Sequence, residues 1–395
     1  MTTPAPAPPT DPDGFSFRAG SIQPSGVRKM FELSGPDAVQ FGLGEPDFQP
    51  PEVAIEAFHR AMRDGHNKYT TSMGLPALRE AIAAGWSPWC AGLDTRNVCI
   101  TMSGTNALLT CALTLLDPGD NALIPDPGFV LYGPHAMICG AEARRYPCRF
   151  ENGFVPDVAE LEALVDARTK ALYACFPSNP TGGGLTEAQR DGLIAFARRH
   201  GLWIITDEVY HHMLYDRPHV SFVGAGYERV LMVNSFSKTF AMTGWRIGYV
   251  LAESVEAVAR ASRLQYYVTA CPNDAMQYGV LAAIEEAPDY PAMMMRAFRE
   301  RRDRVVAALN AMPGVECAVP EGAFYAFPRV VVPGMTSADV AMALLADGVV
   351  VSPGTAFGPA GEGHLRLAFT TSMAQIDEGL SRMAGTLARL AAVPA

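Results

Sequence analysis

The chain has 395 residues, of which 49% are hydrophobic and 18% are charged. This composition is typical of a globular protein with a large core and excludes a disordered or fibrous chain. The formal net charge is -10 and no run of more than two Lys or Arg residues occurs, which disfavours nucleic acid and anionic membranes as partners, because both attract basic surfaces.

The eight cysteines are scattered, mostly in apolar segments, and form no C-x-x-C pair. We therefore expect reduced thiols in the core rather than a disulfide framework or a zinc site. No apolar run is long enough to span a membrane, and the N-terminus lacks the charged-then-apolar pattern of a secretion signal. These features predict a cytoplasmic protein with no membrane partner.

Residues 1–14 are rich in proline and are predicted to form a disordered tail. Residues 50–285 are predicted to form a large domain, because apolar segments alternate there with amphipathic ones. The apolar segments are continuous, as expected for strands that are buried on both faces of a sheet. The candidate strands are Val98–Met102, Ala122–Pro125, Ala171–Phe176, Leu202–Thr206, Val230–Val233 and Ile247–Leu251.

Helices are predicted between these strands, for example at Thr105–Leu116 and Thr186–His200. The second helix has Thr186 as its N-cap, Gln189 completing a capping box, and Gly201 as a stop signal. Strands that alternate with helices in this way predict an α/β fold with a mostly parallel sheet and helices on both of its faces.

Residues 286–395 have a different pattern and are predicted to form a smaller α+β domain, completed by residues 15–49. A long charged helix, Ala292–Met312, is followed by the segment Gly322–Phe327 and by a helix at Ser337–Ala346. Two short strands and a final helix are expected after that.

Four polar segments each follow a predicted strand directly. In a doubly wound sheet, the carboxyl ends of the strands form the edge at which ligands bind. We therefore expect the four segments to meet at this edge; they are Ser103-Gly104-Thr105, Asn179, Asp207 and Lys238.

Lys238 lies in the stretch Asn234–Arg246, in a turn of small polar residues after an apolar strand. A lysine at the end of a buried strand points to chemistry rather than to surface charge. Its amine can form a Schiff base with an aldehyde, and Arg246, eight residues later, can hold a phosphate. Together the two residues suggest pyridoxal phosphate as a cofactor.

The ring of this cofactor needs partners, and four residues are candidates. Its nitrogen must stay protonated, which requires a buried carboxylate, and Asp207 is placed for this role. Asn179 and Tyr210 could hydrogen-bond to the phenolic oxygen, and Phe129 could stack on the ring. Three of the four also have an ordinary structural explanation, Asp207 as a turn cap and the two aromatic residues as core side chains.

The phosphate group needs hydrogen-bond donors and positive charge. Gly104 and Thr105 open a helix whose free N–H groups and dipole suit a phosphate, although any good N-cap has this appearance. Ser235, Ser237 and Arg246 could complete the site, since a guanidinium matches phosphate bidentately.

Arg366 lies in the alternating segment His364–Phe369, which predicts a strand with the arginine and the leucines on opposite faces. An amino-acid substrate needs a fork of donors for its α-carboxylate, and Arg366 could supply that fork. A surface ion pair is the alternative role for this residue.

On these residues, the chain resembles the class I/II aminotransferases, which are pyridoxal phosphate enzymes of fold type I, similar to aspartate aminotransferase. The resemblance runs from about Ser21 to the last helix and implies a large domain with a sheet of the seven-stranded type. The motifs that carry it are Leu43–Phe48, Tyr69–Glu80, Ser178–Gly182, Asp207–Tyr210, Ser235–Lys238, Gly244–Tyr249 and Arg366–Leu367.

The resemblance also implies roles for individual residues. Lys238 is similar to the lysine that forms the Schiff base and then shuttles a proton, Asp207 to the partner of the ring nitrogen, and Tyr69 to a tyrosine that reaches the phosphate of a neighbouring subunit. A homodimer with shared active sites is therefore implied. Arg366, Gly44 and Asn179 match the α-carboxylate site, Asn179 and Tyr210 match the partners of the phenolic oxygen, and Ser103, Gly104, Thr105, Ser235, Ser237 and Arg246 match the phosphate site.

The implied activity is transfer of an amino group from an L-amino acid to a 2-oxo acid in a ping-pong cycle, with these two acids as small-molecule partners. Thr105 stands where some aspartate-acting relatives carry a lysine, which disfavours aspartate, while Tyr266, Tyr267 and Thr269 favour neutral or aromatic side chains. A lyase or a specialised biosynthetic enzyme on the same fold is the alternative. A transcription regulator is disfavoured because only a short tail precedes the fold, and an inactive homologue because the expected site residues are present.

Overall fold

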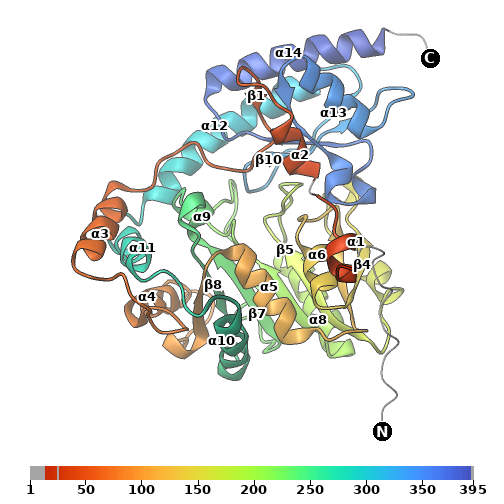
Figure 1. Cartoon of the computed structure of the whole chain (residues 1–395). Coiled ribbons are helices and arrows are strands. Elements are labelled where there is room, and N and C mark those ends of the chain that lie inside the picture. The colour runs from red at the N-terminus through yellow and green to blue at the C-terminus, as the bar shows by residue number, and fades with distance from the viewer. Residues whose placement is uncertain (1–13, 25, 393–395) are drawn as a thin grey trace.

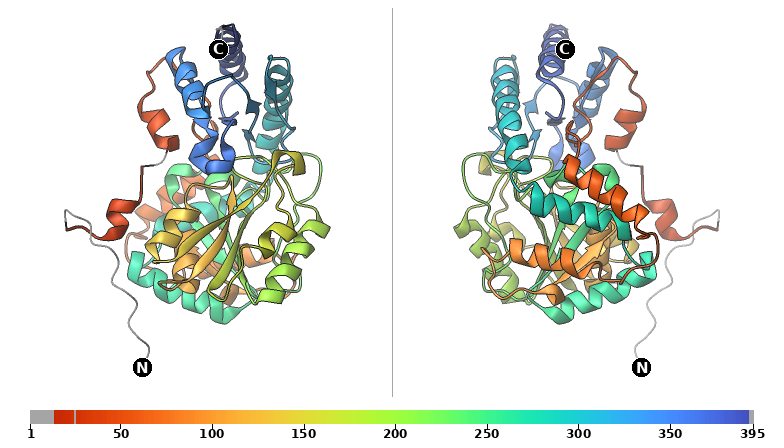
Figure 2. Two further views of the ribbon diagram at one scale, coloured as in Figure 1. Left: turned by 90° about the vertical axis from the view of Figure 1, so that its right-hand side faces the viewer. Right: turned by 90° about the vertical axis from the view of Figure 1, so that its left-hand side faces the viewer.

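The structure is a computed structural model that describes residues 14–24 and 26–392. The predicted disordered tail lies outside this range except for Gly14. A unit that contains the main sheet occupies the lower part of Figure 1, and a second unit, formed mostly by residues after 290, lies above it (Figures 1 and 2).

The main sheet has seven strands in the order β2-β8-β7-β6-β5-β3-β4. Adjacent strands from β4 to β7 run parallel, whereas β8 is antiparallel to both β7 and β2. The predicted α/β fold with a mostly parallel sheet is therefore confirmed. The strands are β2 (Val98–Thr101), β3 (Asn121–Asp126), β4 (Glu142–Pro147), β5 (Thr169–Cys175), β6 (Trp203–Asp207), β7 (Val230–Ser235) and β8 (Gly248–Leu251).

All six predicted strands are present within a few residues of their expected bounds, but β4 was not predicted. This strand lies at the edge of the sheet, and Tyr146 is its only buried residue. An edge strand needs no continuous apolar run, because water reaches one side of it. Its polar sequence, with Arg144 and Arg145 at the centre, therefore gave no signal.

Helices cover both faces of the sheet, as predicted (Figures 1 and 2). Alternate residues of the strands point into two separate cores; in β6, Ile204 joins one core and Ile205 the other. One face is covered by α5 (Gly104–Leu115), α6 (Tyr132–Ile138) and α10 (Val255–Thr269). The other is covered by α3 (Glu52–Arg63), α4 (Pro76–Gly85), α7 (Val158–Glu162), α8 (Glu187–His200) and α11 (Asp274–Glu286).

The predicted capping box of α8 is confirmed. The hydroxyl of Thr186 accepts a hydrogen bond from the backbone N–H of Gln189 at 3.3 Å, and the Gln189 side chain accepts one from the Thr186 N–H at 2.9 Å. Gly201 ends the helix with a φ of 66°, in the left-handed region that favours glycine.

The second unit packs three long helices around short strands. Its three-stranded sheet has the order β10-β14-β13, and β9 pairs with β11. The predicted helices of this region are present, but three short strands, not the expected two, lie between the last two helices. The elements are α12 (Tyr290–Asn310), β9 (Val315–Glu316), β10 (Tyr325–Ala326), β11 (Arg329–Val330), α13 (Ser337–Ala346), β12 (Val349–Val350), β13 (Ser352–Pro353), β14 (Leu365–Ala368) and α14 (Met373–Ala391).

The N-terminal segment contacts both units. Strand β1 (Val39–Gln40) pairs in parallel with β12, and Met30 of α2 (Gly26–Glu32) joins the core of the second unit. Helix α1 (Phe17–Ser21) lies instead beside α6 of the sheet-containing unit (Figure 1), where Arg18 donates a hydrogen bond to the Ile138 carbonyl at 2.9 Å. The domain boundaries at residues 15–49, 50–285 and 286–395 remain a prediction.

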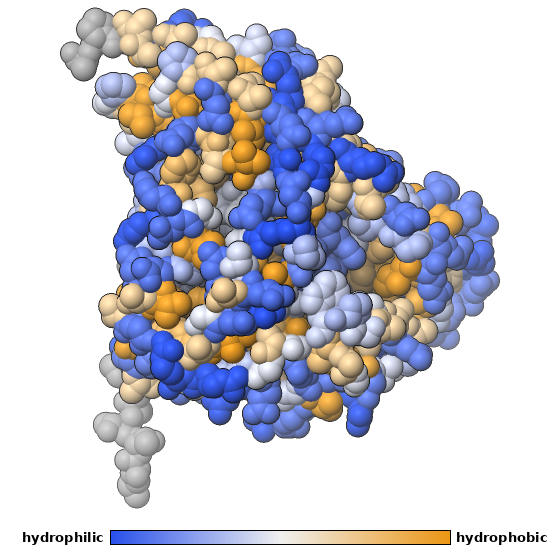
Figure 3. Space-filling model, turned by 180° about the vertical axis from the view of Figure 1, so that it is seen from behind, coloured by the Kyte–Doolittle hydropathy of each residue, from blue (hydrophilic) through white to orange (hydrophobic). Residues whose placement is uncertain are grey.

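Within the described residues, no helix combines the length and the apolar character that crossing a membrane requires. On the face that Figure 3 displays, hydrophobic residues are interspersed with hydrophilic ones.

Candidate active site

The residues predicted to bind a cofactor converge at the carboxyl edge of the main sheet, around a cavity of about 130 Å³. Strands β5, β6 and β7 each deliver one polar segment to this edge. The predicted residues that line the cavity are Gly104, Thr105, Phe129, Asn179, Asp207, Tyr210, Ser235, Ser237, Lys238 and Arg246. The remaining lining residues are Leu108, Cys175, Val209 and Thr243.

Lys238 lies in α9 (Phe236–Thr239), a single helical turn that directly follows β7. Its amine donates a hydrogen bond to the carbonyl of Gly44 at 2.6 Å. Burial lowers the pKa of the amine to about 8, against the opposing charge of Glu45 and with help from the nearby Arg366 and Arg246 guanidinium groups. At neutral to mildly alkaline pH, a useful fraction of this lysine is therefore neutral and nucleophilic.

Asp207 is the last residue of β6, and only 3% of its surface is exposed. Burial raises the pKa of its carboxyl to about 6, while a hydrogen bond from the Tyr132 hydroxyl opposes this rise. That hydroxyl lies 2.9 Å from Oδ2 of Asp207. Tyr132 was missed by sequence reasoning, because a tyrosine in an apolar helical segment is indistinguishable from an ordinary core residue. A buried carboxylate with this support is suited to hold a protonated nitrogen.

Arg366 of β14 is 3% exposed and reaches the same edge from the second unit. Its Nη1 donates to Oδ1 of Asn179 at 3.1 Å, and its Nη2 donates to the Gly42 carbonyl at 2.5 Å. The buried Nε has no hydrogen-bond partner in the part of the chain that the structure describes. The alternative of a surface ion pair is therefore wrong, because the guanidinium is buried and keeps an unsatisfied donor for an anion.

The cavity is bounded on one side by the N-terminus of α5 and by the turn after β7. Gly104 and Thr105 are the first residues of α5, where backbone N–H groups have no intrahelical acceptor. The hydroxyls of Ser235 and Ser237 lie 2.9 Å apart. Arg246, with a left-handed φ of 54°, also lines the cavity. Such N–H groups, hydroxyls and a guanidinium form a donor set that fits a phosphate.

Two predicted cofactor-binding residues do not line the cavity. Ser103 is the N-cap of α5, and its hydroxyl accepts a hydrogen bond from the Asn106 N–H at 3.0 Å. Tyr69 is 90% exposed and lies in a separate open hollow that is also lined by Met102 and Thr269. Tyr267, which was expected to shape the substrate pocket, is 86% exposed and likewise does not line the cavity of its own chain.

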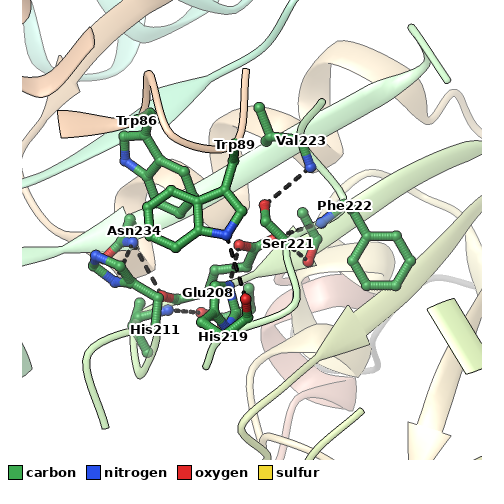
Figure 4. Close-up of polar contacts among 12 residues, drawn as sticks. Trp86, Trp89, Glu208, His211, His219, Ser221, Phe222, Val223 and Asn234 are labelled. Atoms are coloured by element: carbon green, nitrogen blue, oxygen red, sulfur yellow. Dashed lines mark hydrogen bonds and ion pairs between the residues drawn. The ribbon is translucent and has the colours of Figure 1, made fainter. Parts of the chain in front are cut away.

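Glu208, the residue after Asp207, carries a buried carboxylate that the sequence analysis did not single out (Figure 4). Oε2 of Glu208 lies 2.6 Å from Nε2 of His219, and both side chains are almost fully buried. Its Oε1 accepts hydrogen bonds from the Thr206 hydroxyl at 3.0 Å and from the Phe222 N–H at 3.1 Å. The carboxylate thus ties the end of β6 to the far end of the loop that follows it.

Asn234 of β7 completes this connection (Figure 4). Its side-chain amide donates to the Glu208 carbonyl at 3.0 Å and lies 2.9 Å from Nδ1 of His211, which is itself 3.1 Å from the same carbonyl. Burial lowers the pKa of His211 well below its usual value, so the ring is neutral. The loop that carries Tyr210 is thereby fixed to the strand that leads into Lys238.

Comparison with known proteins gives a consistent result. A family model described as "Aminotransferase class I and II" matches residues 36–383. The aspartate aminotransferase of Pyrococcus horikoshii is 36% identical over 369 residues, which cover 92% of this chain and 94% of that protein. The aromatic-amino-acid aminotransferase 2 of Thermococcus litoralis is 36% identical over 380 residues, which cover 93% of this chain and 97% of that protein.

A solved structure of Thermus thermophilus aspartate aminotransferase with maleate has the same fold. It matches with a TM-score of 0.89 and 33% sequence identity, and the match covers 94% of this chain and 99% of that one. The similarity therefore extends over both units and is not confined to the main sheet.

Gly248 provides a test of the anion site, because a Cβ built on it would lie 2.6 Å from the Gly104 nitrogen and 2.7 Å from the Asn234 carbonyl oxygen. We expect Gly248→Ala to displace the start of α5 and to weaken binding of pyridoxal phosphate at least about tenfold, measured by equilibrium dialysis. Gly85→Ala is the matched control, since a Cβ there meets nothing within 4 Å. Unchanged affinity in Gly248→Ala would show that this end of α5 does not hold the phosphate.

Proposed function

The chain belongs to the class I and II aminotransferases and is therefore a transaminase, and on that premise we propose that it uses pyridoxal phosphate to move the amino group of an L-amino acid to a 2-oxo acid in a ping-pong cycle. The observation that carries this proposal is the convergence of Lys238, Asp207 and Arg366 on one edge of the sheet, from three separate parts of the chain.

The residues around the cavity fit this cofactor. Asp207 would hold the protonated ring nitrogen, Asn179 and Tyr210 the phenolic oxygen, and Phe129 one face of the ring. The phosphate would bind to the start of α5, with Ser103 capping that helix, and to Ser235, Ser237 and Arg246. When bound, pyridoxal phosphate supplies the electron sink for negative charge that develops at the α-carbon of the substrate.

Lys238 is proposed as both the attachment point and the general base. Its lowered pKa of about 8 lets the amine accept a proton near physiological pH and release it again. The Gly44 carbonyl, 2.6 Å from the amine, holds it on the side of the cavity that faces the second unit. Displaced from the cofactor by the amine of the substrate, the lysine would take the proton from the α-carbon and return it to the cofactor.

Arg366 would orient the substrate. Its guanidinium is fixed by Asn179 and the Gly42 carbonyl. Its Nε has no partner in residues 14–24 and 26–392 and so leaves a donor for the α-carboxylate. With the carboxylate held by Arg366 and the substrate amine joined to the cofactor, the α-carbon would lie within reach of the freed Lys238, which is the positioning that proton transfer requires.

A homodimer with shared active sites is proposed from the surface around Tyr69. This side chain is 90% exposed in a hollow of about 810 Å³, and apolar side chains are exposed at Met102, Tyr266 and Tyr267. Exposed aromatic residues grouped in this way are typical of protein interfaces. A second copy of the chain would cover them, and Tyr69 would then reach the phosphate of its partner.

For the amino donor, neutral or aromatic side chains are proposed. Thr105 lines the cavity without adding charge, so it offers no partner for a second carboxylate. The relatives with known names include both aspartate and aromatic-amino-acid aminotransferases, so aspartate belongs in the same test.

The first test follows the visible absorption of the purified enzyme while single L-amino acids are added without any oxo acid. We expect the band of bound pyridoxal phosphate to give way to that of pyridoxamine phosphate, most readily with neutral or aromatic amino acids. Release of ammonia or carbon dioxide instead would favour a lyase.

Lys238→Ala is expected to lose turnover by several orders of magnitude, whereas Lys170→Ala, which changes a surface lysine near Asp120, should match the parent.

The pH dependence of cofactor loading provides a second test. Only the neutral amine of Lys238 attacks an aldehyde, so the rate of loading should rise with pH and level off above a midpoint near the lowered pKa of about 8. Stopped-flow absorbance of the cofactor-free enzyme mixed with pyridoxal phosphate measures this rate. A midpoint near the ordinary lysine value of about 10.4 would contradict the proposed environment of the amine.

Shared active sites are tested by mixing two defective variants, Lys238→Ala and Tyr69→Ala. If Tyr69 serves the partner, a mixed dimer contains one site with both residues intact, and activity at limiting cofactor should recover after the subunits exchange. If Tyr69 serves its own chain, no site in the mixed dimer is intact and activity stays low. Sedimentation velocity confirms that both variants and the mixture are dimers.

A further inference from the structure

Tyr325 belongs to the segment Gly322–Phe327, to which the proposed function assigns no role. It lies in β10, is 1% exposed, and contacts the site at three points. Its hydroxyl meets Tyr210, its ring covers Arg366, and its phenol oxygen fills the space beside Gly44.

The hydroxyl of Tyr325 lies 2.8 Å from that of Tyr210. Burial raises the pKa of both phenols, so both keep their protons. If Tyr210 donates its proton to the phenolic oxygen of the cofactor, its own oxygen is left as an acceptor, and Tyr325 must be the donor in the pair. A donor behind Tyr210 polarises its O–H bond and strengthens the bond that Tyr210 makes in turn.

The ring of Tyr325 covers one face of the Arg366 guanidinium. The guanidinium carbon lies 4.7 Å from the ring centre of Tyr325 and 4.7 Å from that of Phe357. Two aromatic faces restrict the planar group to one orientation, in which its edge carries the donors toward Asn179 and the substrate.

The phenol oxygen also explains the glycine at position 44. A Cβ on Gly44 would lie 2.0 Å from this oxygen, so only glycine leaves room for it. Because the Gly44 carbonyl accepts the hydrogen bond from Lys238, Tyr325 also borders the segment that holds the catalytic amine.

We infer that Tyr325 is a positioning residue with two separable functions: its hydroxyl orients the proton of Tyr210 toward the cofactor, and its ring fixes Arg366 for the substrate carboxylate. This inference rests on the proposed function. The other titratable or charged groups that face the tyrosine pair are Cys175, Asp207 and Arg366, and they are unchanged in the variants below.

Tyr325→Phe tests the hydroxyl, because it keeps the ring. The readout is the pH at which the visible band of the bound cofactor titrates, not the activity. The group that titrates is the nitrogen that joins Lys238 to the cofactor. Without the Tyr325 hydroxyl, Tyr210 makes a weaker hydrogen bond to the phenolic oxygen, so the anionic form of that oxygen is less stabilised once this nitrogen has lost its proton. Loss of the proton becomes less favourable, and the midpoint should rise by a few tenths of a pH unit. Tyr210→Phe should raise it further, and the double variant should add nothing to Tyr210→Phe alone.

Tyr325→Met tests the ring, since it fills the core without an aromatic face. We expect the KM for the amino donor to rise at least about tenfold, while Tyr325→Phe leaves this KM within about twofold of the parent. If Tyr325→Met does not fold, Tyr325→Phe still tests the part of the inference that concerns the hydroxyl.

Tyr227→Phe is the matched control. Its hydroxyl is also buried and donates to backbone carbonyls, at Leu202 and Ala197, but it does not line the cavity. This variant should leave the titration midpoint unchanged. A parent enzyme that shows no titrating band with pyridoxal phosphate would contradict the proposed function itself. A parent band that titrates, with Tyr325→Phe indistinguishable from Tyr227→Phe or additive with Tyr210→Phe, would overturn the inference alone.

Discussion

The amine of Lys238 and the carboxyl of Asp207 lie with little access to water at the carboxyl edge of the main sheet, and much of the structure serves to hold them there. Burial has the largest effect on both, lowering the pKa of the amine to about 8 and raising that of the carboxyl to about 6. Neither group would remain in place without partners. The Gly44 carbonyl accepts a hydrogen bond from the amine, and the Tyr132 hydroxyl donates one to the carboxylate.

This arrangement depends on contact between the two units. Lys238 and Asp207 belong to the sheet-containing unit, whereas Arg366 is held by strands of the second unit, on which β1 and the segment leading to Gly44 also pack. The bond from Arg366 to Asn179 and the bond from Lys238 to Gly44 both cross between the units. The amine, the guanidinium and the ring-binding residues therefore have their proper distances only when the units are packed against each other.

The hydrogen-bond network around Glu208, next to the candidate active site, differs chemically from that around Arg366 within the site. Both carboxylate oxygens of Glu208 have hydrogen-bond partners: Oε2 lies against His219, and Oε1 accepts two further hydrogen bonds. Arg366, by contrast, retains a buried donor, Nε, without a hydrogen-bond partner among the described residues. The fully bonded network around Glu208 rigidifies the loop between β6 and β7, whereas this donor of Arg366 can bind an anion. This difference separates a structural carboxylate from a candidate ligand-binding group more clearly than burial does.

The sequence by itself determined the α/β fold, the positions of the buried strands, the capping box at Thr186 and the polar residues at strand ends, because each of these follows from local periodicity or from a fixed spacing. It also indicated the family, through motifs in a defined order. Only the tertiary structure revealed the edge strand β4, the hydroxyl of Tyr132 on Asp207, and the contacts of Tyr325 with Tyr210 and Arg366. The strand β4 was hidden because an edge strand needs no continuous apolar run. The tyrosine contacts were hidden because their partners lie far apart in the chain, and an aromatic residue in an apolar segment has the same local pattern whether it fills a core or directs a proton.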